Sequence, residues 1–332
     1  MILGRDNQSM QDATKLNFDL SVALNATSGP VGIIRAQGAD AAKFLQGQLT
    51  QDVALLGLSE GRLSAWCSAK GRMLASFVLF KNAHDDIMLM CTASVLPSTL
   101  KRLQMFVMRA QCKLSDATAL FEVRGLAGSL ASNITSLAPW TLKRDGRDRP
   151  DGEVITLQLP PGHHAGQAVP RAVQVTPLAQ DAELASHDEG LSLWQYLNVT
   201  SGIAHITTPV SELFVPQMLN YESVGGVNFK KGCYPGQEVV ARSQFRGTLK
   251  RRAYIVSSDA PMAAGQEVFD SRDAEQPCGT VASAAVQPDK VSFLAIVSMQ
   301  TSAVDSPRLS LGAADGPALV LQALPYALLE DI

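Results

Sequence analysis

Cysteine is sparse in this chain of 332 residues, and what there is lies scattered. The five cysteines are odd in number, and no two of them form a Cys-x-x-Cys pair. This pattern excludes a disulfide framework and a zinc site made of closely spaced ligands. We therefore expect no metal site in this chain, and an iron–sulfur cluster held at one thiol would need ligands from elsewhere. The five are Cys67, Cys91, Cys112, Cys233 and Cys278.

Long apolar runs are also missing. No run approaches the roughly 18 residues that a membrane-spanning helix needs, so we expect no membrane contact. Residues 1–15 are polar and mixed in charge, and they lack the features of a signal or transit peptide. These absences predict a cytoplasmic location. A hydrophobic content of 46% with 18% charged residues is typical of a globular protein, and the length allows two or three domains.

The first half of the chain predicts helices packed on antiparallel sheet. Asp40 lies before an apolar stripe of Phe44, Leu45 and Leu49, which indicates a helix whose first turn Asp40 caps. Apolar runs at 76–81 and 87–91 flank residues 82–86, which predicts a hairpin with a five-residue loop that includes Asp85 and Asp86. A helix with leucines at 96, 100 and 103 and a strand at 112–114 follow. This order of elements is typical of an α+β fold.

The second half of the chain has a different pattern of polar and apolar residues. Residues 143–152 are charged and broken by Gly and Pro, so we expect a surface loop there. A short helix at 191–197 carries Trp194 and ends before Gly202. Beyond residue 253, short apolar runs alternate with Gly, Pro and Asp, which predicts a small all-β barrel or sandwich.

The segment around Cys233 is the strongest candidate for chemistry. Tyr234-Pro235-Gly236-Gln237 predicts a type II turn, and Glu238 and Arg242 have the spacing of an ion pair on one helix face. Gly232 and the preceding lysines, Lys230 and Lys231, favour an exposed thiol that nearby positive charge holds as thiolate. The alternative is that Cys233 is a buried apolar filler, as free cysteines often are.

Positive charge concentrates in the same segment. Residues 230–252 contain seven basic residues and one acid, in a chain of net charge −3. This basic strip predicts contact with an anionic partner, which could be a carboxylate-rich ligand, a phosphate or RNA. A solvated basic face is the alternative. The basic residues are Lys230, Lys231, Arg242, Arg246, Lys250, Arg251 and Arg252.

Four segments together resemble the YgfZ family, folate-binding relatives of the glycine-cleavage T-protein. They are Lys-Gly-Cys-Tyr-x-Gly-Gln-Glu with its surroundings at 230–252, Phe-Val-Pro-Gln-Met-Leu-Asn at 214–220, residues 38–52, and Ala-Lys-Gly-Arg at 69–72. The resemblance implies a T-protein-like cloverleaf of two ferredoxin-like lobes with a small C-terminal β-barrel, arranged around a folate-sized cavity. It implies an intertwined α+β region at 17–250, with the second lobe at about 53–140, and a barrel at 251–332.

The resemblance also implies a function. Members of the family assist the assembly or repair of iron–sulfur clusters in client enzymes, which include radical enzymes that modify tRNA. By this resemblance the catalytic residues are Cys233 and Lys231, with Cys233 at the mouth of the cavity. The implied cofactor is tetrahydrofolate or a derivative, held by Trp194, Gln217 and Asn220. The alternative for Trp194 is a core anchor on its short helix. The supporting motif residues are Gly232, Tyr234, Gly236, Gln237, Glu238 and Arg242.

The chain departs from the T-protein pattern at positions that matter for aminomethyl transfer. Ala75-Ser76 replaces the Asp pair of those enzymes, and neither side chain can serve as a general acid or base. Thr200 replaces a Glu that holds the pterin, and Val31 replaces a tryptophan. Three functions therefore remain open: an accessory factor for iron–sulfur proteins, a working aminomethyltransferase, and a tRNA-binding module that uses the basic strip.

Overall fold

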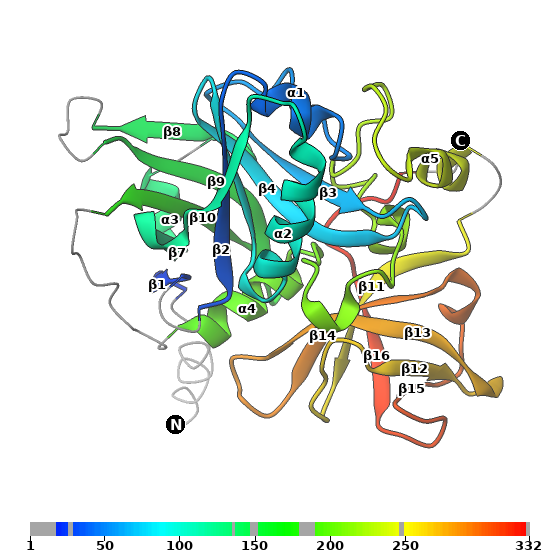
Figure 1. Cartoon of the computed structure of the whole chain (residues 1–332). Helices are drawn as coiled ribbons and strands as arrows, with labels where there is room; N and C mark the ends of the chain where they lie inside the picture. The colour runs from blue at the N-terminus through cyan, green and yellow to red at the C-terminus, as the bar shows by residue number, and fades with distance from the viewer. Residues whose placement is uncertain are drawn as a thin grey trace, which may run out of the picture.

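The computed structural model describes residues 18–25, 29–134, 137–146, 152–178, 190–245 and 249–329. These residues form two five-stranded antiparallel sheets and a closed six-stranded barrel, shown in Figure 1. No helix in these ranges is long and apolar enough to cross a membrane. The described helices are α1 (Ala41–Gln46), α2 (Leu96–Val107), α3 (Ser129–Ile134), α4 (Leu191–Thr200) and α5 (Gln237–Phe245).

The first sheet has the strand order β3-β4-β5-β2-β6. The helix α2 packs on this sheet against β2 and β6, in front of the sheet in Figure 1. The buried residues of β4 and β5 belong to the main hydrophobic core. The strands are β2 (Val31–Gln37), β3 (Gly61–Cys67), β4 (Met73–Ala83), β5 (Asp86–Thr92) and β6 (Lys113–Asp116).

The second sheet has the order β1-β7-β10-β9-β8 and takes its strands from both sides of the first in the sequence. In the sequence, the first sheet is therefore an insertion between β1 and β7 of the second sheet. Its strands span residues 31–116, whereas the resemblance implied a second lobe at about 53–140. The strands are β1 (Leu20–Ala23), β7 (Phe121–Ala127), β8 (Leu142–Asp145), β9 (Val154–His164) and β10 (Gln167–Pro177).

The barrel has the order β11-β14-β13-β12-β15-β16 and lies at the lower right of Figure 1. Its predicted β character is confirmed. The helix α4 packs against β13 and β14 as well as β9, so it connects the barrel to the second sheet. One hydrophobic cluster runs from both sheets into the barrel. The strands are β11 (Arg251–Ser258), β12 (Glu267–Asp270), β13 (Asp273–Val286), β14 (Phe293–Gln300), β15 (Leu309–Leu311) and β16 (Ala318–Gln322).

Two predictions about aspartates in the first sheet are wrong. Asp40 precedes α1 but makes no cap, because its carboxylate accepts a hydrogen bond from the backbone N–H of Gln111 at 2.8 Å. The predicted hairpin is present as β4 and β5, yet its strands extend to Ala83 and resume at Asp86. Asp86 is therefore a buried strand residue, and it forms a two-pronged ion pair with Arg35 at 2.8 and 2.7 Å.

The loop predicted at 143–152 is also partly wrong. Its first three residues belong to β8, which pairs with β9, and residues 147–151 lie outside the described part of the chain. The helix predicted at 191–197 is confirmed as α4 and extends to Thr200. Gly202 follows it with a φ of 71°, a left-handed conformation that favours glycine.

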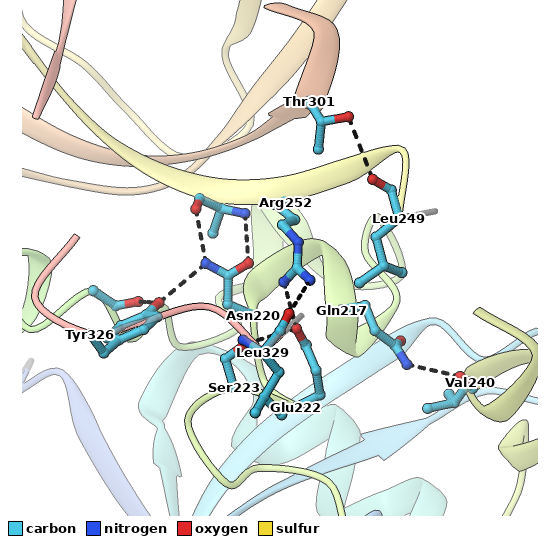
Figure 2. A network of polar contacts seen from close by, with 12 residues as sticks. Gln217, Asn220, Glu222, Ser223, Val240, Leu249, Arg252, Thr301, Tyr326 and Leu329 are labelled. Carbon is cyan, nitrogen blue, oxygen red and sulfur yellow. Dashed lines mark hydrogen bonds and ion pairs between the residues drawn. The ribbon is translucent and has the colours of Figure 1, made fainter. Parts of the chain in front are cut away.

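A polar junction holds the barrel to the segment that precedes α5 (Figure 2). Arg252 on β11 donates to Glu222 at 2.7 Å, and both side chains are buried. Burial raises the pKa of Glu222, although Arg252 acts in the opposite direction. Next to this pair, Asn220 forms two hydrogen bonds with the backbone of Ala253, at 2.9 and 3.1 Å. The start of the barrel is therefore fixed to residues 220–222 by specific polar contacts.

We predict that Arg252→Met lowers the free energy of unfolding by about 3–5 kcal/mol, because it leaves the buried Glu222 carboxylate without its guanidinium. The deficit should shrink as the pH falls, since protonation neutralises Glu222. Adding Glu222→Gln should recover most of the loss. Urea unfolding measures this, with the half-exposed Arg251→Met as control. A loss of equal size in the double variant would contradict the assignment.

Candidate functional site

The loop that carries Cys233 has the predicted geometry. The N–H of Gln237 donates to the carbonyl of Tyr234 at 3.2 Å and Gly236 has a φ of 77°, as a type II turn requires. Glu238 and Arg242 then form an i,i+4 ion pair at 2.5 Å on α5. Of the five cysteines, Cys233 is the exposed one, so the interpretation of this thiol as a buried filler is wrong.

Lys231 anchors this loop to α1 from inside the protein. Its side chain is buried, and Nζ donates to the carbonyl of Leu49 at 2.7 Å and to that of Gln46. The ammonium also lies 5.0 Å from the centre of the Tyr234 ring, within cation–π distance. Burial lowers the pKa of Lys231 to about 8, although the charges of Asp52 and Cys233 act in the opposite direction. The positive charge is thus close enough to interact with the thiol.

A close approach of two glycines fixes the turn after Cys233. A Cβ on Gly236 would lie 2.4 Å from the carbonyl oxygen of Ser68 and 2.6 Å from the Cα of Gly71. A Cβ on Gly71 would in turn lie 2.9 Å from Val239. Both glycines also have positive φ, so any side chain at either position would push the two turns apart. The turn between β3 and β4 therefore supports the Cys233 loop directly.

Gln217 makes a further contact with the segment that carries Cys233. It lies on the 3₁₀ turn Pro216–Leu219, is fully buried, and donates from Nε2 to the carbonyl of Val240 on α5 at 2.8 Å (Figure 2). The four separate segments that carry the family resemblance thus meet around Cys233. Gln217 and Asn220 were predicted to hold folate. Both side chains are completely buried, and each donates a hydrogen bond to a backbone carbonyl of another structural element.

A cavity of about 310 Å³ lies where the two sheets and the barrel meet. Its wall is mainly apolar and includes residues of β5, β9, β10, α4 and β13. Two barrel segments, 262–264 and 282–284, close one side. Neither Gln217 nor Asn220 is among the lining residues, and Cys233 is not among them either. The expectation that the thiol lies at the mouth of the cavity is therefore wrong.

Trp194 does line the cavity, and it also serves as a core anchor. Its ring lies against Gly125 on β7, where a Cβ would come within 2.8 Å of the indole. Trp194 as a whole is 3% exposed. A second indole, Trp140, lines the same space and was missed by the sequence interpretation.

Two titratable residues of the cavity, the buried Arg171 and the partly buried His205, were also missed. Burial lowers the pKa of Arg171 to about 9, so its guanidinium is still charged at neutral pH. Burial and this neighbouring charge lower the pKa of His205 to about 4, which leaves its imidazole neutral. The sequence does carry a signal for Arg171, because it interrupts the apolar residues of β10. An isolated arginine in a buried strand needs a compensating partner.

Ala75 and Ser76 occupy structural positions on β4. Both are buried, and the Ser76 hydroxyl accepts a hydrogen bond from the N–H of Ile206 at 2.8 Å. Thr200, at the position of the expected pterin-binding Glu, accepts a hydrogen bond from the N–H of His163 at 3.0 Å. These side chains are committed to holding the fold together.

The basic strip is not one continuous surface. Lys231 and Arg252 point inward, and Arg242 is paired with Glu238. Lys230 and Lys250 are exposed. Arg246 lies outside the described residues. The cationic surface available to an anionic partner is therefore smaller than the sequence count indicates.

Comparison with solved structures identifies the class of fold. The glycine cleavage system aminomethyltransferase T of Bartonella henselae superposes with a TM-score of 0.64 at 14% identity, covering 92% of this chain and 86% of that one. The architecture is thus that of an aminomethyltransferase T, as the resemblance implied.

Curated relatives narrow this class to one family. The tRNA-modifying protein YgfZ of Sodalis glossinidius is 30% identical over 315 residues, which is 90% of this chain and 91% of the relative. The protein of the same name from Photorhabdus laumondii is 31% identical over 309 residues, with the same coverage. No family model matches the chain. The chain belongs to the YgfZ family.

The geometry of Lys231 predicts a pH-dependent effect on Cys233. Replacing Lys231 by Met removes a nearby positive charge, so alkylation of Cys233 by iodoacetamide should slow on the order of fivefold below pH 8. The difference should shrink as the pH rises through 8, because Lys231 then loses its charge in the wild type. Mass spectrometry of the Cys233 peptide measures the rate. Lys230→Met is the control, and an equal effect in that variant would contradict this role of Lys231.

Proposed function

We propose that this protein is a folate-dependent accessory factor in the assembly or repair of iron–sulfur clusters in client enzymes, including radical enzymes that modify tRNA. The observation that carries the proposal is the assembly around Cys233, where four distant segments hold one exposed thiol beside the buried charge of Lys231. The tRNA-modifying name of the relatives supports the same class of client. We place this activity in the cytoplasm.

The cavity supports folate as the cofactor. Folate has a flat pterin, an aromatic ring and carboxylates, and the cavity offers two indoles, apolar walls and the guanidinium of Arg171. A volume of about 310 Å³ lies at the lower end of the range for small-molecule sites. Trp194, Trp140 and Arg171 are the residues that would hold it. When bound, folate would supply a one-carbon carrier.

Cys233 would provide a thiolate as nucleophile or as a ligand for iron. No group of three or more His, Cys, Asp or Glu residues that could hold a metal ion occurs in the described part of the chain. We therefore propose that a cluster bound at Cys233 is the cargo, with its other ligands supplied by the client enzyme. The exposure of the loop allows a second protein to reach the sulfur.

Aminomethyl transfer receives less support. That reaction needs a carboxylate near the folate nitrogen, and the positions of the Asp pair are occupied by the buried Ala75 and Ser76. Folate-dependent release of ammonia from aminomethylated lipoyl carrier protein would reverse this ranking. Direct tRNA binding through the basic strip is also less supported, since two of its residues are buried. Such binding would weaken steeply with salt.

We predict that Cys233→Ala fails to restore tRNA methylthiolation in cells that lack the native protein, because the substitution removes the sulfur and leaves the loop contacts of Lys231 in place. Mass spectrometry of tRNA nucleosides measures the modification. Cys112→Ala, which alters a half-buried thiol outside the loop, should restore it fully. Full rescue by Cys233→Ala would refute the thiol mechanism.

Trp194→Leu should weaken the binding of 5-formyltetrahydrofolate by roughly threefold to tenfold, because it keeps an apolar side chain but removes the aromatic face. Isothermal titration calorimetry measures the affinity. The matched control is Trp66→Leu, since Trp66 is equally buried but does not line the cavity. Unchanged affinity in Trp194→Leu would remove this residue from the site, and a wild type that binds no folate would refute the cofactor.

A further inference from the structure

The described residues that line the cavity carry positive charge but no negative charge. Arg171 is the one permanently charged side chain among the described residues that line it, and Asp, Glu and Lys are absent from that set. His205, the other basic group, is neutral near pH 7 because burial and the charge of Arg171 lower its pKa. The cavity therefore presents an uncompensated positive charge to whatever occupies it.

The hydrogen bonds of Arg171 leave part of its guanidinium uncommitted. Nε and Nη2 donate to the carbonyl of Pro160 at 3.1 and 2.9 Å, and Nη1 donates to Oδ1 of Asn198 at 2.6 Å. A guanidinium has five N–H groups, so one on Nη1 and one on Nη2 have no partner among the described residues. Both acceptors are neutral, and no carboxylate of the described chain pairs with Arg171.

A buried charge of this kind is costly unless an opposite charge joins it. The protein does not supply that charge in the described residues. The guanidinium carbon lies 5.5 Å from the centre of the Trp194 ring, so the unpaired cation and an aromatic surface are adjacent. This pairing matches a ligand in which a carboxylate is attached to, or lies close to, a flat ring.

We propose that Arg171 is the anion anchor of the cavity and binds a carboxylate of an aromatic ligand through its two uncommitted N–H groups. The inference rests on the proposed folate function and deepens it, because it assigns the aminobenzoylglutamate part of folate to the Arg171 end. Asn198 and Pro160 act as positioning residues that hold the plane of the guanidinium. His205 adds a neutral hydrogen-bonding group beside it.

A pair of matched small probes tests the anchor on the wild-type protein. p-Aminobenzoylglutamate and its diamide, in which both glutamate carboxylates are amides, have the same ring and nearly the same shape, but only the first is an anion. p-Aminobenzoylglutamate should bind at least roughly tenfold more tightly by calorimetry. Equal affinity of the two probes would overturn the proposal, and this comparison needs no variant to fold.

Variants then assign the effect to Arg171. Arg171→Gln should weaken p-aminobenzoylglutamate by roughly 10- to 100-fold while leaving 6-hydroxymethylpterin unchanged. Arg171→Lys should recover part of the loss, since it restores charge without the two-pronged geometry. Arg124→Gln, on the neighbouring strand β7 and outside the cavity, is the control and should bind both fragments as the wild type does.

The outcomes separate this inference from the proposed function. If 5-formyltetrahydrofolate binds the wild type and Arg171→Gln equally well, folate binding stands and the anchor is refuted. If Arg171→Gln weakens the pterin fragment as much as the glutamate fragment, Arg171 shapes the whole cavity and the assignment of the carboxylate end is refuted. If the wild type binds p-aminobenzoylglutamate more tightly than its diamide but binds no folate, the anchor is supported and the folate function fails.

Discussion

The buried ammonium of Lys231 is the contact on which the Cys233 loop depends. Its hydrogen bonds to the carbonyls at the end of α1 and just beyond join two segments separated by more than 180 residues in sequence. The close approach of Gly236 to Gly71 then sets the direction in which the chain leaves the loop. An exposed cysteine is thereby held in a fixed position by a buried cation and a turn that excludes side chains.

The exposed thiol of Cys233 and the cavity lie in different parts of the molecule. The thiol is exposed beside α5, whereas the aromatic and cationic groups of the cavity are enclosed between α4, the sheets and the barrel. The surroundings of Cys233 and the cavity wall are each built from segments that are distant in sequence. One short segment bonds to both α5 and the barrel: Gln217 donates to Val240, Asn220 to Ala253, and Glu222 accepts from Arg252 (Figure 2). None of these four side chains lines the cavity.

Sequence patterns predicted those features that depend on neighbouring residues. The turn at 234–237, the pair Glu238–Arg242 and the helix around Trp194 all follow from local spacing, and the structure contains them. Asp40 and Asp86 were assigned wrongly because their partners, Gln111 and Arg35, are distant in sequence. No local pattern identifies such partners.

The cavity was harder to predict for the same reason. Its lining comes from five or more elements, and a residue such as His205 has no distinctive neighbours in sequence. The four segments around Cys233 could be recognised as a set, but their mutual contacts could not. Arg171 was missed although the sequence carries a clue, because it is the one cation in an otherwise largely apolar strand, β10.

The barrel supplies part of the cavity wall, through residues 262–264 and 282–284. A ligand bound in the cavity would contact the barrel and both sheets, so its binding free energy would stabilise all three parts of the fold. By mass action, occupancy would shift unfolding of every one of them together. Any such ligand would couple the stabilities of these parts of the chain, and the cooperativity of unfolding would rise with its concentration.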